Sequence, residues 1–397
     1  MRPLRTITEI PLKAKRVFVR VDFNVPLKQE GEAWVVTDTT RLVGALPTIR
    51  YIIEQGGRCI LASHLGRPKG KSIKKYSLEP VAAKLSELLG KDVILTDDCI
   101  GDGPRGLSHQ LRNGDVMLLE NLRFRPEEEE NSVEFANQLL ELCDIYISDA
   151  FGALHRAHTS TFMAPKLAAV KGVGFLVQKE LEALLPLREN PHRPFVLIMG
   201  GSKISDKIGV LEHFLPKVDR VIIGGAMAYA FLKARGTEIG NSLCDDRQVQ
   251  LASKLIKGAL VRNVELLIPV DHLVASKIDD TKSASVTPGA AIPDGKMGVD
   301  IGPNTLALYE KGLEGAETIF WNGPMGVFEV PAFAQGTFEL AKKIAATTAK
   351  KLAGGGDSVA AIVQAGVESS FDFISTGGGA TLEFLEGKEL PGLKALE

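Results

Sequence analysis

Short apolar, β-branched runs alternate with amphipathic stretches along the whole chain, and this alternation restricts the fold more than any other feature. The expected strands are 17–21, 59–62, 92–96, 116–119, 145–148, 195–199, 220–223, 265–270, 318–321 and a weaker one at 350–353. The expected helices between them include 42–54, 79–89, 133–142 and 247–259. This spacing predicts an α/β fold with two doubly wound parallel sheets. Ligands of such sheets bind at the carboxyl ends of the strands, so the residues after each strand are the candidates.

A chain of 397 residues exceeds what one hydrophobic core usually fills, so we expect two domains. The segment 178–188 reads as a helix, and a Glu-Asn-Pro-His-Arg-Pro cluster ends it. We therefore predict a first domain at 1–177, a connecting helix and hinge at 178–193, and a second domain at 194–383.

Charge and cysteine usage exclude several classes of protein. The 47 basic and 49 acidic residues give a net charge of −2, which argues against nucleic acid or an anionic membrane as the main partner. Four widely spaced cysteines without a C-x-x-C pair indicate free thiols in a reducing compartment. We find neither the apolar core of a signal peptide nor a run of 18 apolar residues, so we expect a cytoplasmic protein without membrane spans.

Basic side chains follow several strands of the first half. They are Arg41, His64, Arg67, Arg123 and Arg156, and Asp22 and Asn24 follow the first strand after Arg20. Like charges gathered at one sheet edge repel each other, and a bound anion would stabilise them. We therefore favour an anion site over the alternative, a scatter of surface salt bridges.

Three segments of the first half invite other interpretations. The segment 66–72 resembles a phosphate-binding P-loop, but it has three residues between its glycines instead of four, and it contains a proline. His155 and His158 have the spacing of a metal pair, but no third ligand stands near them. The acidic run 127–130 is expected to be the solvated start of a helix.

Glycine-rich segments follow the strands of the second half. They are 200–207, 224–226, 321–329, 354–358 and 375–381. We expect Lys203 and Lys207 to share one helix face, with Ser202 or Ser205 capping that helix, and bound polyphosphate to offset their charge at its N-terminus. The glycines at 224 and 225 should leave a flat slot for a base. Asp357 is the natural Mg²⁺ ligand, because Mg²⁺ bridging phosphates needs one or two carboxylates.

Together these segments closely resemble the phosphoglycerate kinase family of bacterial type. The resemblance rests on eight motifs in order: RVDFNVP (20–26), SHLGRP (63–68), LLENLRF (118–124), DAFG-x-x-HRAH (149–158), GGSK-x-SDK (200–207), WNGPMGVFE (321–329), GGGDS (354–358) and STGGGAT (375–381). It implies two Rossmann-like domains, with the C-terminal tail 384–397 returning to the first. It also implies a cytoplasmic, monomeric, glycolytic phosphotransferase with a carboxyl group as acceptor (ATP:3-phospho-D-glycerate 1-phosphotransferase) that uses Mg²⁺ with ATP or ADP.

The resemblance also implies residue roles. The residues implied to hold 3-phosphoglycerate or 1,3-bisphosphoglycerate are Asp22, Phe23, Asn24, Arg41, His64, Leu65, Gly66, Arg67, Arg123 and Arg156. Those implied to hold the nucleotide are Gly201, Lys203, Lys207, Gly224, Gly225, Gly298, Val299, Asn322, Val327, Glu329, Gly355, Gly356, Asp357 and Ser358, with Asp357 as metal ligand. The implied catalytic residues are Arg41, Lys203, Gly378 and Gly379, with the glycines 377–379 forming the anion hole.

We expect direct in-line phosphoryl transfer, because no serine, cysteine or histidine stands beside a base as an activated nucleophile would. Since the two anion sites belong to different domains, closure of the domains is expected to bring them together and exclude water. Two other classes of protein fit the sequence less well. A dinucleotide-dependent oxidoreductase would need a G-x-G-x-x-G segment, which the chain lacks. A non-catalytic nucleotide- or anion-binding protein would not need Asp357 together with the lysines and glycine clusters.

Overall fold

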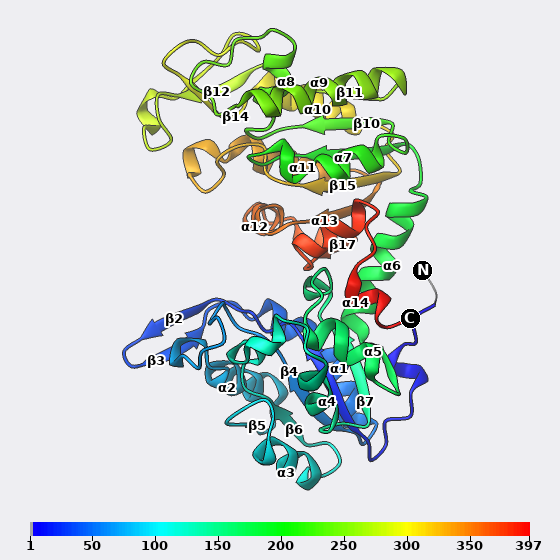
Figure 1. Ribbon diagram of the computed structural model, residues 1–397. Helices are drawn as coiled ribbons and strands as arrows, with labels where there is room; N and C mark the ends of the chain where they lie inside the picture. The colour runs from blue at the N-terminus through cyan, green and yellow to red at the C-terminus, as the bar shows by residue number, and fades with distance from the viewer. Residues whose placement is uncertain (1–2) are drawn as a thin grey trace. The chain divides into compact units, whose positions relative to one another are not determined.

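The computed structural model describes residues 3–397, so the first two residues of the predicted first domain lie outside it. The chain forms two compact units, and each has its own parallel sheet. One unit runs up to Glu182 and includes Glu389–Glu397, and the other is Ala183–Lys388. The chain passes from the first unit to the second within helix α6 (Phe175–Glu189), which begins three residues before the predicted helix (Figure 1).

The first sheet has six parallel strands in the order β5-β6-β4-β1-β7-β8. Their bounds are β1 (Arg16–Val21), β4 (Arg58–Ala62), β5 (Val93–Leu95), β6 (Val116–Leu118), β7 (Ile145–Asp149) and β8 (Lys171–Val173). The helices of this unit are α1 (Thr40–Glu54), α2 (Glu79–Leu89), α3 (Asp102–Gln110), α4 (Val133–Leu140) and α5 (Ala164–Leu167). The sheet grows outward from β1 in both directions, with β4 on one side and β7 on the other.

The second sheet also has six parallel strands, in the order β11-β10-β9-β15-β16-β17. Their bounds are β9 (Phe195–Met199), β10 (Arg220–Ile223), β11 (Glu265–Leu267), β15 (Thr318–Asn322), β16 (Lys350–Gly354) and β17 (Phe373–Ser375). The helices are α7 (Ile208–Phe214), α8 (Ala228–Ala234), α9 (Asp246–Val261), α10 (Pro303–Leu313), α11 (Gln335–Ala345), α12 (Gly356–Gln364) and α13 (Gly379–Leu385). The order reverses at β9, between β10 and β15.

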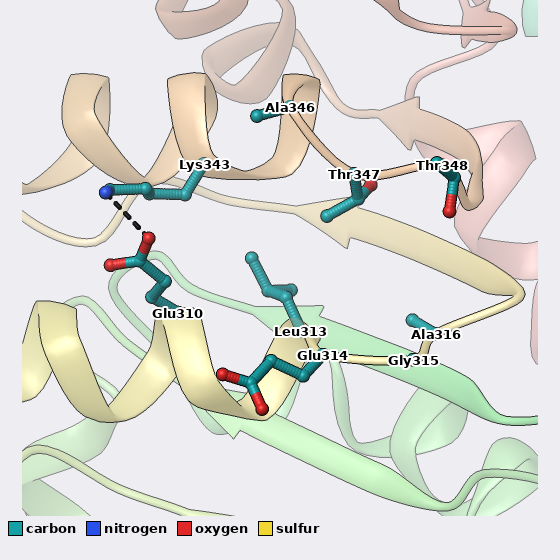
Figure 2. Close-up of a pocket in the computed structure, with 9 residues that line it drawn as sticks. All are labelled: Glu310, Leu313, Glu314, Gly315, Ala316, Lys343, Ala346, Thr347 and Thr348. Carbon is teal, nitrogen blue, oxygen red and sulfur yellow. Dashed lines mark hydrogen bonds and ion pairs between the residues drawn. The ribbon is translucent and has the colours of Figure 1, made fainter.

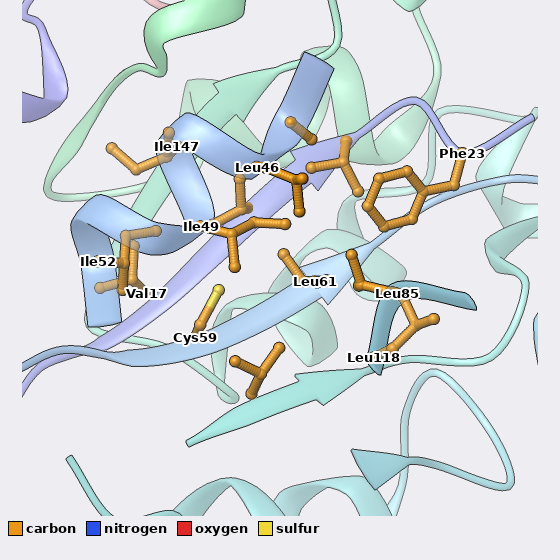
Figure 3. Packing of buried hydrophobic residues seen from close by; sticks show 14 of the residues in the cluster. Val17, Phe23, Leu46, Ile49, Ile52, Cys59, Leu61, Leu85, Leu118 and Ile147 are labelled. Carbon is orange, nitrogen blue, oxygen red and sulfur yellow. The ribbon is translucent and has the colours of Figure 1, made fainter. Parts of the chain in front are cut away.

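Burial at helical spacing explains why α1 packs on the first sheet. Leu42, Ala45, Leu46, Ile49 and Ile52 are all buried, and they recur every three or four residues along the helix. Figure 3 shows Leu46, Ile49 and Ile52 packed with strand residues such as Val17 and Leu61. This packing fixes the sheet edge at which α1 begins, and therefore the position of Arg41.

The doubly wound architecture is confirmed, and the C-terminal segment does return to the first unit. Helix α14 (Pro391–Lys394) packs there: Gly392 N donates to Leu154 O (3.0 Å), and Lys171 Nζ donates to Ala395 O (2.7 Å). The expectation of parallel strands alone was incomplete. An antiparallel hairpin, β2 (Leu27–Glu30) and β3 (Ala33–Val36), and a sheet of β12 (His272–Ala275), β13 (Ser285–Val286) and β14 (Met297–Ile301) were missed.

Several predicted boundaries also differ. The strand expected at 265–270 ends at Leu267, and the helix expected to run to residue 142 ends at Leu140. The short edge strands β8 and β17 were not predicted. None of the helices in the described part of the chain is long and apolar enough to cross a bilayer.

Candidate functional site

In the first unit, polar residues after β1, β4 and β6 form one hydrogen-bonded group. Arg41 Nη1 donates to Asp22 Oδ1 and to Asn24 O, both at 3.0 Å. Asn24 Oδ1 in turn accepts from Gly66 N (2.9 Å), and Gly66 O accepts from Arg123 Nη1 (2.7 Å). The structure thus joins five of the predicted residues at the carboxyl edge of the sheet.

His64 lies within the electrostatic field of the arginines at this edge. Only 7% of it is exposed, and burial lowers the pKa of its imidazole well below the ordinary value. The positive charges of Arg20, Arg123, Arg41 and Arg156 lower the pKa of His64 further. The surroundings of His64 are therefore strongly cationic, as expected of a site for an anion.

The remaining predicted residues of this unit differ in their exposure and in their existing hydrogen bonds. Arg67 is exposed and has no hydrogen bond or ion pair with any residue in 3–397, so its guanidinium is available. Arg156 is half-buried, and its Nε donates to His155 Nε2 (3.2 Å). The side chains of Phe23 and Leu65 are buried, so any contact they make with a ligand would be through the backbone.

The expectation that the run 127–130 is solvated was wrong for Glu128. Its side chain is fully buried and accepts from Ser160 N (2.9 Å) and Ser160 Oγ (2.5 Å). The sequence reasoning also missed Asn121, which organises the edge. Asn121 Oδ1 accepts from Leu65 N (3.2 Å) and Arg123 N (3.0 Å). The signal available for Asn121 was its position in the loop that follows a buried strand.

In the second unit, three glycine-containing loops meet where the strand order reverses. Gly200 N donates to Asn322 O, and Gly201 N donates to Pro324 O, both at 2.9 Å. Gly225 N donates to Met325 O at the same distance, which ties the β10 loop to the β15 loop. The loops after β9, β10 and β15 therefore form one backbone-bonded junction.

The glycines at this junction allow the loops to approach each other closely. A Cβ at Gly225 would overlap the backbone of Gly201, and one at Gly224 would overlap the Met325 side chain. Gly225 also has φ of +64°, which disfavours other residues. A side chain at either position would therefore push these loops apart, and the predicted slot for a base beside them stays a prediction.

Lys207 is held at the neighbouring ends of β15 and β16. Its Nζ donates to Asn322 Oδ1, and Asn322 Nδ2 donates to Gly354 O (2.6 Å). Gly323 N donates to Ser358 Oγ (2.5 Å), which links the same loop to the first turn of α12. Burial lowers the pKa of Lys207 to about 8, although the carboxylates of Asp357 and Asp206 oppose the shift.

The expected placement of the two lysines on one helix face was wrong. Lys203 is extended (φ −136°, ψ 131°) and precedes a 3₁₀-helix, Ile204–Asp206, while Lys207 stands between that turn and α7. Neither Ser202 nor Ser205 caps α7, whose N-cap is Lys207. Because α7 begins only at Ile208, after extended Lys203 and the 3₁₀ turn, the two lysines do not lie on one α-helical face. Lys203 is exposed and makes no hydrogen bond or ion pair within the described residues.

The other predicted residues lie on three further elements. Val327 N donates to Val299 O (2.8 Å), and both valines belong to a small apolar cluster with Phe333 on the β14 side. Gly298 lies beside Val299 in β14. The helices α12 and α13 begin at the predicted glycine triplets, with Gly355, Gly356 and Asp357 at the start of α12 and Gly378 and Gly379 at the start of α13. Glu329 is exposed.

The resemblance implies a bound Mg²⁺, and this edge offers one carboxylate for it. Asp357 is an exposed carboxylate in the first turn of α12, and its charge reaches Lys207. Among residues 3–397, no three His, Cys, Asp or Glu side chains are grouped as a metal cage. One carboxylate is what Mg²⁺ needs when phosphates supply most of its other ligands.

A pocket of about 450 Å³ in the second unit lies elsewhere. Figure 2 shows its lining from the ends of α10 and α11, including the Lys343–Glu310 ion pair (2.7 Å). Its residues 314–316 and 346–348 precede β15 and β16, so it lies at the amino ends of these strands. Because ligands of doubly wound sheets bind at the opposite edge, this pocket is not the candidate site.

The fold and these two edges define a doubly wound α/β protein of two units, each with a polar ligand edge suited to anions. A family model described as phosphoglycerate kinase matches residues 7–388. The phosphoglycerate kinases of Anaeromyxobacter dehalogenans (strain 2CP-C) and Prosthecochloris aestuarii are 53% and 49% identical to the chain over 396 and 395 residues, with 99% of each chain covered. The chain belongs to the phosphoglycerate kinase family, which makes it a kinase.

Solved structures agree with this assignment. The phosphoglycerate kinase of Coxiella burnetii superimposes with a TM-score of 0.89 at 43% identity, covering 99% of both chains. That of Pyrococcus horikoshii OT3 gives 0.83 at 32% identity, covering 98% of both.

Proposed function

We propose that the protein catalyses the reversible, Mg²⁺-dependent transfer of a phosphoryl group from 1,3-bisphosphoglycerate to ADP, giving 3-phosphoglycerate and ATP. The observation that carries the proposal is that each unit has its own anion-suited edge, in a chain of this family. The edge with His64 and the arginines would hold the phosphoglycerate, and the edge with Lys207 and α12 would hold the nucleotide.

The chemistry of each edge supports this division. Planar guanidinium groups bind carboxylate and phosphate in a fixed orientation, and the first unit presents them at Arg41 and Arg67. The buried Arg123 adds positive charge beneath them. In the second unit, glycine N–H groups at the start of α12 and the Lys207 ammonium would neutralise a polyphosphate. Asp357 would hold Mg²⁺, which supplies charge neutralisation on the phosphates.

Transfer is proposed to be direct and in line, since positioning and charge neutralisation are what this reaction requires. Arg41 and Lys203 would act on the transferred group, with the N–H groups of Gly378 and Gly379 as an anion hole. Lys203 suits this role because it is exposed and unpaired within the described residues. Because these groups belong to different units, catalysis would require closure, which would also exclude water. We further propose a cytoplasmic, monomeric enzyme.

A coupled assay of ATP consumption with 3-phosphoglycerate and Mg²⁺ tests the proposal. We expect turnover that requires all three components and that is lost on chelation of Mg²⁺. Turnover no faster than that of the Lys203→Ala variant would instead favour the alternative, a non-catalytic nucleotide- or anion-binding protein.

A further inference from the structure

A buried chain of hydrogen bonds lies beneath the basic edge of the first unit. Ser160 Oγ contacts the Glu128 carboxylate (2.5 Å) and accepts from Arg20 Nε (2.8 Å), and Arg20 Nη2 donates to His64 Nδ1 (3.0 Å). Glu128, Ser160 and Arg20 are at most 1% exposed. The chain therefore connects an inner carboxylate to the imidazole at the site.

Three hydrogen bonds hold the guanidinium of Arg20, whereas Arg67 is exposed. Besides Ser160 and His64, it donates through Nη1 to Val21 O. With 1% of its surface exposed and its guanidinium engaged in this way, Arg20 is not free to turn toward a ligand. Arg20 can therefore affect ligand binding only through the residues it contacts, such as His64.

The bond from Arg20 determines which nitrogen of His64 carries the proton. A guanidinium has donors only, so His64 Nδ1 must be the acceptor and cannot bear hydrogen. The neutral ring then carries its proton on Nε2, and an imidazolium would set two N–H groups against each other. His64 Nε2 has no hydrogen-bond partner among residues 3–397, so its N–H can donate to a ligand.

Glu128 and Ser160 explain why Arg20 stays in this position. The Ser160 hydroxyl has one proton, which the carboxylate takes, so its lone pairs face Arg20 Nε. Burial raises the pKa of Glu128, while the charge of Arg20 opposes that shift. A buried guanidinium and a buried carboxylate joined through one hydroxyl stabilise each other in the interior.

We propose that Arg20, anchored by Ser160 and Glu128, is a positioning residue that keeps His64 neutral with its proton on Nε2. His64 would then donate one hydrogen bond of fixed direction to the anionic substrate. The affinity for that substrate would not change with histidine titration between about pH 5 and pH 8. The substrate named below rests on the proposed function, whereas the state of His64 does not.

The tautomer can be read directly in the unmodified protein. Two-bond ¹H–¹⁵N correlation spectra of histidine-labelled protein, assigned with His64→Gln, should show an unprotonated Nδ1 and a protonated Nε2 across this pH range. Adding 3-phosphoglycerate should shift the Nε2 resonance. A proton on Nδ1, or an imidazolium near neutral pH, would overturn the proposal. A protein without kinase activity would still give this spectrum, so the two proposals can fail separately.

A charge-neutral double variant tests the role of the buried pair. Arg20→Met with Glu128→Gln removes both charges and leaves no unpaired one. We expect the KM for 3-phosphoglycerate to rise about tenfold, because nothing then holds His64 in the tautomer with its proton on Nε2. The KM for ATP should stay within about twofold.

The matched control is Arg50→Met with Glu130→Gln, which makes the same substitutions at exposed positions. This control should behave like the unmodified protein. An unchanged KM for 3-phosphoglycerate in the Arg20/Glu128 variant, or equal changes for both substrates, would refute the positioning role. If the variant does not fold, the spectrum of the unmodified protein decides.

Discussion

Replacing Lys207 with methionine removes a largely buried ammonium from the candidate nucleotide edge of the second unit. Burial lowers the pKa of Lys207 from 10.5 to about 8. The folded protein therefore releases this proton at lower pH than the unfolded chain does. Between about pH 8 and pH 10.5 the unfolded chain binds more protons, so the stability contributed by this residue rises with pH.

The size of the effect follows from the two pKa values. Below about pH 8 both states are protonated and the cost of burying the charge is fully present, whereas above about pH 10.5 it is absent. Between about pH 7 and about pH 10, the unmodified protein should gain about 2.5 kcal/mol relative to Lys207→Met. The lost hydrogen bond to Asn322 and the altered packing add a constant that does not depend on pH.

The measurement is the free energy of unfolding by denaturant at these two pH values. The chain has two tryptophans, of which Trp321 is buried in the second unit, so a Trp34→Phe background makes fluorescence report on that unit. Lys203→Met is the matched control, since it removes an exposed ammonium from the same loop. The burial argument is refuted if the free energies of unfolding of the unmodified protein and Lys207→Met change between the two pH values by the same amount, to within about 0.5 kcal/mol.

Three further outcomes are expected. Lys203→Ala should lower kcat at least about 100-fold without changing the melting temperature, and near-normal turnover would contradict its role. Arg67→Ala should raise the KM for 3-phosphoglycerate about tenfold and that for ATP much less, whereas equal effects in steady-state assays would argue against separate sites. Gly225→Ala should destabilise the second unit by about 2 kcal/mol or more in denaturant titrations, because its Cβ would overlap Gly201. Gly236→Ala, with positive φ but no described neighbour within 4 Å, should cost only the backbone strain, about 1 kcal/mol, so equal losses would refute the overlap.

Local pattern was sufficient for elements with strong periodicity. Strands such as Phe195–Met199 and Arg220–Ile223 were predicted with their observed bounds, because fully buried parallel strands are continuous apolar runs between polar breaks. The starts of α12 and α13 followed from their glycine triplets. The strand before Gly354 was predicted despite two lysines, and only the structure gave its register, with Thr318 opposite Lys350.

Local pattern was insufficient where a residue's environment comes from distant parts of the chain. The acidic run at 127–130 looks solvated in sequence, yet Glu128 is buried because Ser160 and Arg20 close over it. The close approach of Gly224 and Gly225 to the loops after β9 and β15 could not be read from the sequence either. No short segment contains either piece of information.

By itself, the sequence determined the class of fold, the edge of each sheet to inspect and the residues gathered there, because strand periodicity and strand-end chemistry are local properties. The tertiary structure alone decided which of these side chains are held and which are free. Arg20 and Arg67 are both arginines near strand ends, but one is enclosed by Ser160, Val21 and His64 and the other is exposed. Burial and hydrogen bonding between distant segments assign their different roles, because both depend on residues far apart in the chain.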